Sequence, residues 1–184
     1  MMLLRIALAF SLALLALPGK AADTAQKRYP LSDRGTLVVS VPAAWTEEVR
    51  QEDKAKPPTI SYRLGAGREP QVIMTPTWPM RADTPPLTPE TVRSYVEQAA
   101  KAVKDEALEK EIPITEFKGK SGTGYYFEAT DKAPKAGEFK FLRQGMLPVD
   151  GLLVAFTILA NSRQEPVLRD AMQLLEGAAR APQK

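Results

Sequence analysis

The chain has 184 residues, of which 26% are charged and 44% are hydrophobic, and it contains neither cysteine nor histidine. The absence of these two residue types excludes disulfide bonds, Ser-His-Asp triads, cysteine nucleophiles and metal or haem sites built on thiolate or imidazole ligands. The formal net charge is +3, and no basic stretch alternates with aromatic residues, so the sequence does not predict a nucleic-acid-binding surface.

The first 21 residues have the pattern of a cleavable secretory signal peptide. Arg5 supplies a positive charge, a 12-residue run that is apolar except for one serine follows, and Gly19 and Ala21 are small residues at the positions that precede a cleavage site. We expect cleavage after Ala21, with cleavage after Ala22 as the alternative. A membrane anchor is the weaker interpretation, because a spanning helix needs about 20 apolar residues.

Removal of this segment changes the charge of the protein. It takes away Arg5 and Lys20, so the mature chain would have 163 residues and 23 basic against 22 acidic side chains. The net charge falls from +3 to +1, which weakens any case for binding nucleic acid or an anionic membrane. Because no cysteine could carry a lipid, we predict a protein without a membrane anchor, periplasmic or secreted.

The rest of the chain predicts a single folded domain over residues 35–184. Residues 22–34 are small and polar without an apolar period, and we interpret them as a flexible leader. The turn pair Asp150-Gly151 favours a hairpin. Alternating or β-branched runs predict strands at 36–41, 46–51, 59–64, 71–77, 114–118, 124–130 and 138–146.

Two helices are predicted. Thr88 can cap the first, Pro89 suits its first position and Glu90 places an acid in its first turn, and the pattern continues to about Leu108. The second helix begins near Pro166. The apolar stripe of the first helix contains Val92, Tyr95, Val96, Ala99, Val103 and Ala107.

Residues 152–159 form a nearly continuous apolar run. A strand with one wet face alternates between apolar and polar residues, whereas a continuous run indicates cover on both faces. We therefore expect an α+β fold in which a predominantly antiparallel β-sheet is sandwiched between helices, an α/β/α arrangement.

The order of these elements resembles the PsbP-like superfamily, which includes the periplasmic DcrB-like proteins of bacteria and a Ran-binding nuclear import factor. The resemblance covers residues 35–179 and is carried by a first strand leading into Pro42-Ala43-Ala44-Trp45, the capped helix, the aromatic strand opened by Gly124-Tyr125-Tyr126, a long hairpin, an apolar strand and a closing helix. It implies an antiparallel sheet flanked by helices and an exported bacterial protein that binds or assists other proteins. This chain departs from its relatives in having no histidine for a metal role and no lipid-bearing cysteine.

No catalytic motif is complete, and we predict a non-enzymatic protein without metal or cofactor. A phosphate-binding loop would need an earlier glycine before Gly119-Lys120-Ser121. Two carboxylates that face one pocket can hydrolyse a glycosidic polymer, but Glu47 and Glu48 are neighbours in a predicted strand and point to opposite faces. A carboxylate-dependent hydrolase of the cell envelope, using these residues and Glu128, remains an alternative.

The loop after residue 77 is the predicted binding site. Trp78, Met80 and Arg81 are residue types that anchor interfaces, and loops often carry function. The alternative is a tryptophan that folds back to cap the edge of the sheet. We expect the partner to be another envelope protein, and we keep a small-ligand carrier as a further alternative that would require an apolar cavity.

Overall fold

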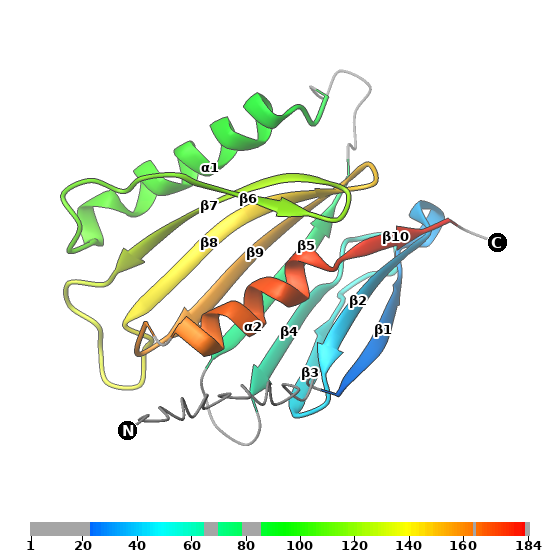
Figure 1. Ribbon diagram of the computed structural model, residues 1–184, viewed down its shortest axis with the longest axis horizontal. Helices are drawn as coiled ribbons and strands as arrows, with labels where there is room; N and C mark the ends of the chain where they lie inside the picture. Colours follow the sequence, from blue (N-terminus) through cyan, green and yellow to red (C-terminus); the bar gives the residue numbers. More distant parts are fainter. Residues whose placement is uncertain (1–22, 65–69, 79–85, 164, 183–184) are drawn as a thin grey trace, which may run out of the picture.

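The computed structural model describes residues 23–64, 70–78, 86–163 and 165–182 (Figure 1). The predicted signal peptide, residues 1–21, lies outside the described residues. None of the helices within these ranges is long and apolar enough to cross a membrane.

The large sheet is antiparallel throughout and has seven strands in the order β3-β4-β5-β9-β8-β7-β6 (Figure 1). The prediction of a mainly antiparallel α+β fold is therefore confirmed. The strands are β3 (Trp45–Arg50), β4 (Thr59–Leu64), β5 (Gln71–Thr77), β6 (Thr115–Gly119), β7 (Gly122–Thr130), β8 (Phe141–Val149) and β9 (Leu152–Ala160).

A second sheet of three strands, in the order β1-β2-β10, includes the segment that was predicted to be a flexible leader. That prediction was wrong, because β1 (Thr24–Pro30) pairs along its whole length with β2 (Thr36–Pro42). Its side chains are mostly exposed, so the pairing depends on main-chain hydrogen bonds that residue polarity does not reveal. The third strand is β10 (Ala179–Ala181).

The two predicted helices are present. Helix α1 (Pro89–Val103) begins as expected, with the Thr88 hydroxyl accepting a hydrogen bond from the Thr91 amide at 3.2 Å. It ends earlier than predicted, in the 3-10 turn η2 (Lys104–Glu106). The other helices are α2 (Glu165–Glu176) and the short η1 (Ser32–Arg34).

The main core fills the space between one face of the large sheet and a layer made of α2 and the small sheet (Figure 1). The expectation of a sheet sandwiched between helices therefore needs a correction: on this side, a second sheet shares the cover with a helix. The largest side chains that are fully buried here include Tyr62, Phe156, Leu31, Leu37, Ile60 and Met74.

A smaller core lies between α1 and the opposite face of the large sheet. Tyr125 and Phe127 of β7 are buried beneath the helix, whereas Tyr126 points to the other face and packs against the main core. Alternation along the strand could not decide between these two orientations. The buried helix residues are Val92, Val96 and Ala100.

Strand β9 differs from its prediction in an important way. Its burial alternates: the side that faces the main core is buried, whereas the other side is only half-buried. The reason is that α1 packs against β7 and β8, so none of the described helices packs on the same face of β9, β5 and β4. The residues on that less covered side of β9 are Leu153, Ala155, Thr157 and Leu159.

Candidate binding groove

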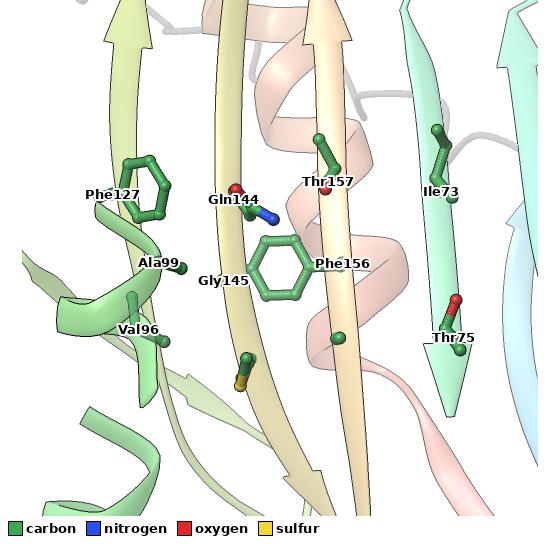
Figure 2. Close-up of a pocket in the computed structure, with 11 residues that line it drawn as sticks. Ile73, Thr75, Val96, Ala99, Phe127, Gln144, Gly145, Phe156 and Thr157 are labelled. Atoms are coloured by element: carbon green, nitrogen blue, oxygen red, sulfur yellow. The ribbon is translucent and has the colours of Figure 1, made fainter. Parts of the chain in front are cut away.

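A cavity of about 230 Å³ lies where α1 meets the uncovered half of the large sheet (Figure 2). We call it the groove. Figure 2 shows residues of α1 at one side, residues of β5 at the other, and side chains of β8 and β9 between them. The residues that define the groove here are Ile73, Thr75, Val96, Ala99, Gln144 and Thr157.

The strand register brings the floor of the groove together. Gln144 on β8 lies opposite Thr157 on β9, and Thr157 lies opposite Ile73 on β5. Residues that are directly opposite in neighbouring strands point to the same face, so these three side chains form one row across the sheet. Val96 and Ala99 are three residues apart in α1 and form the wall beside this row.

The polar side chains of this row have no hydrogen-bond partner among the described residues. Neither the Gln144 amide nor the Thr157 hydroxyl makes a hydrogen bond with any other described residue, and both side chains are half-buried. The Thr75 hydroxyl is 3.4 Å from the Thr59 hydroxyl. An amide can both donate and accept, as can a hydroxyl. The groove therefore offers free donors and acceptors next to apolar surface.

None of the described residues that line the groove has an ionisable side chain. The charged residues of α1 lie on the side away from the groove: Arg93, Glu97, Lys101 and Lys104. The side next to the groove has the uncharged residues Tyr95, Ala99 and Ala102. In a chain with 26% charged residues, this separation leaves a neutral surface. Such a surface suits an uncharged ligand, because a charged group would lose water without gaining a counter-ion.

A second group of polar residues connects the two sheets. The Tyr29 hydroxyl donates to Glu47 and also shares a hydrogen bond with the hydroxyl of Tyr62, and Lys27 lies 3.4 Å from the same carboxylate. Burial raises the pKa of both Tyr29 and Tyr62, so both phenols stay protonated. We interpret this group as a structural link between β1 and the edge of the large sheet.

The carboxylates of the hydrolase alternative do not face one pocket. Glu47 on β3 and Glu128 on β7 are five strand spacings apart, about 24 Å, whereas a glycosidase pair needs roughly 5 to 9.5 Å. Glu128 accepts a hydrogen bond from Arg143 Nε at 2.8 Å, and Glu48 pairs with Arg50 at 2.7 Å. Each acid is therefore engaged in a separate ion pair or hydrogen bond.

Two further features of the described residues bear on catalysis. Gly119 and Gly122 are opposite each other in the β6–β7 hairpin, so Lys120 and Ser121 occupy its turn and no helix follows them, as a phosphate-binding loop would require. No group of three or more Asp and Glu side chains in the described ranges is close enough together to hold a metal ion.

The predicted site residues lie elsewhere. Trp78 is half-buried directly after β5 and packs against the main core, on the opposite side of the sheet from the groove. Met80 and Arg81 lie outside the described residues, so the three-residue site stays a prediction. Sequence reasoning missed the groove, although on the half-covered faces of β8 and β9 Gln144 and Thr157 are single polar residues among apolar ones.

The whole arrangement is similar to that in the solution structure of cyanobacterial PsbP (CyanoP) from Synechocystis sp. PCC 6803. The two match with a TM-score of 0.52, covering 91% of this chain and 99% of that one. The chain has a PsbP-like fold. The sequences are 13% identical, so the likeness concerns the fold alone. No family model matches the sequence, and no curated protein matches it significantly.

The PsbP-like fold confirms the structural part of the resemblance seen in the sequence. In this chain, α1 covers only the β7 and β8 part of its side of the large sheet, and the groove lies at the boundary between the covered and uncovered parts.

Proposed function

We propose that the chain is an exported, non-enzymatic accessory protein that binds another envelope protein through the groove. The observation that carries the proposal is the pairing of free polar groups, on Gln144 and Thr157, with apolar walls at the edge of the sheet face that the described helices leave uncovered. The PsbP-like fold and the signal-peptide pattern of residues 1–21 support the proposal.

The composition of the groove supports binding over catalysis. General acid–base catalysis needs a side chain that titrates near the working pH, and a hydroxyl nucleophile needs a neighbouring base. The described lining of the groove contains hydroxyls and an amide but no carboxylate, amine or guanidinium. A binding role uses the groups that are present.

Export can be tested on the mature protein. Periplasmic or secreted material should begin at Ala22 or Asp23 when its N-terminus is sequenced. Protein that accumulates in the cytoplasm with residues 1–21 still attached would contradict this part of the proposal.

The binding role can be tested with a photo-crosslinking amino acid at two adjacent exposed positions of α1. Ala102 lies on the groove side of the helix and Lys101 on the other side, so they form a matched pair. In the cell that produces the protein, illumination should give a discrete adduct from position 102 and none from position 101.

The adduct must also depend on the groove. Ala99→Trp would fill the groove and should abolish the adduct at position 102 without changing the denaturation midpoint by much, because Ala99 is only half-buried. Equal adducts from both positions, or an adduct that survives Ala99→Trp, would show that the partner does not use the groove.

A further inference from the structure

The uncovered half of the sheet is small. Strand β5 has seven residues and extends over about 20 Å, and the three uncovered strands β4, β5 and β9 give a width of about 14 Å. The area is thus about 300 Å². Two copies packed face to face would bury about 600 Å², below the roughly 1,200 to 2,000 Å² of stable interfaces. These dimensions disfavour a second copy of this chain as the occupant.

The groove is also small for a complete ligand. Its volume of about 230 Å³ is below the roughly 300 to 1,000 Å³ of typical small-molecule pockets. It opens onto the uncovered strands, so an occupant can extend beyond it. Ile73, Val96 and Ala99 give it an apolar lining, whereas Gln144 and Thr157 place free polar groups beside that lining. The groove therefore fits one large apolar side chain of a longer molecule.

The length of the surface sets the length of that molecule. An extended chain rises about 3.3 Å per residue, so about 20 Å accommodates roughly six residues. Main-chain amides and carbonyls of such a segment carry both donors and acceptors, which complement the Gln144 amide and the Thr157 hydroxyl. The lack of ionisable groups among the described lining residues favours a segment without charge.

We infer that the partner contributes an extended, uncharged segment of about six residues, which lies on the uncovered strands and inserts one large apolar side chain into the groove. This inference rests on the proposed function and names the part of the partner that the groove recognises.

The test uses three blocked six-residue peptides and the isotope-labelled mature protein. The first peptide contains Thr and Ser with one central Phe and no charge; the second has Ala in place of Phe, and the third has two Asp residues in place of Thr. The first peptide should shift the NMR signals of the Gln144 side-chain amide and of residues 73–75 and 155–157. Loss of Phe or addition of Asp should each weaken binding about tenfold or more.

Two variants locate the binding site. Ala99→Trp should abolish the shifts caused by the first peptide, whereas the matched variant Lys101→Trp, on the other side of α1, should retain them. Equal binding of all three peptides, shifts outside the groove, or no binding at millimolar concentration would overturn the inference. The inference would also be overturned if the protein formed a dimer in a concentration-dependent way, or if a small neutral molecule saturated the groove by itself.

Failure of the inference and failure of the proposed function give different results. Suppose that position 102 forms an adduct that depends on the groove but no neutral peptide binds. A partner then binds the groove with something other than an extended, uncharged segment, and the inference is wrong while the proposed function stands. If the peptides bind as expected but no adduct forms at position 102, the groove recognises such segments and the proposed accessory role is wrong.

Discussion

The ring of Phe156 on β9 lies against Gly145, its direct partner on β8, and the two residues border the groove (Figure 2). A Cβ atom at position 145 would lie 2.7 Å from Phe156 Cζ and 2.2 Å from the Tyr125 carbonyl oxygen. The close approach of the ring is possible because residue 145 has no side chain.

Gly145→Ala should therefore destabilise the protein by about 2 kcal/mol or more, because the backbone oxygen of Tyr125 cannot move without disturbing the β7–β8 ladder. Urea denaturation measures the change. Gly122→Ala is the matched control, since a Cβ there would meet its nearest atom at an ordinary 3.4 Å. Equal stability of the two variants would contradict the prediction.

Glu128→Ala should cost about 2 kcal/mol of folding stability. The Arg143 side chain is only 9% exposed, and removal of its carboxylate leaves a largely buried guanidinium without an anion. The exposed pair of Glu48 and Arg50 provides the control, and Glu48→Ala should cost less than about 0.5 kcal/mol. Chemical denaturation of both variants distinguishes a buried pair from a surface pair, and similar losses would show that burial does not matter here.

Stability should fall as the pH rises above 10. The folded-state pKa of Tyr29 and of Tyr62 is raised above the unfolded value of about 10, so the unfolded chain loses these protons first and its free energy falls relative to that of the folded chain. The loss should be about 1 kcal/mol per phenol for each pH unit. Tyr29→Phe with Tyr62→Phe should give a flatter profile between pH 10 and 11, and an unchanged slope would contradict the assignment.

Trp78→Ala should lower stability by about 2 kcal/mol, because the ring packs against the main core while remaining half-exposed. Trp78→Phe should recover most of this loss.

The variants also test the predicted interface: in a pull-down with chemical crosslinking, the Trp78→Ala protein should recover fewer partners if the loop is an anchor. Equal recovery of every partner would remove Trp78 from the interface.

Most elements could be predicted from local sequence. The start of α1 follows from Thr88 and Pro89, and the hairpin follows from Asp150 and Gly151, both of which adopt positive φ angles, 47° and 83°. These signals are local because caps and turns depend on a few adjacent residues. Strand β1 was missed, because its pairing with β2 depends on a neighbour and not on its own exposed side chains.

The sequence by itself determined that the chain has no thiol or imidazole chemistry, that it has two amphipathic helices, and that its strands are mostly antiparallel. Only the tertiary structure decided which half of the sheet α1 covers, since an apolar run such as 152–159 shows that a strand is buried but not how far each side is covered. The groove lies at the edge of the half that α1 covers, so its position also depends on the tertiary structure. Gln144 and Thr157 come from different strands, and only the β8–β9 register places them side by side.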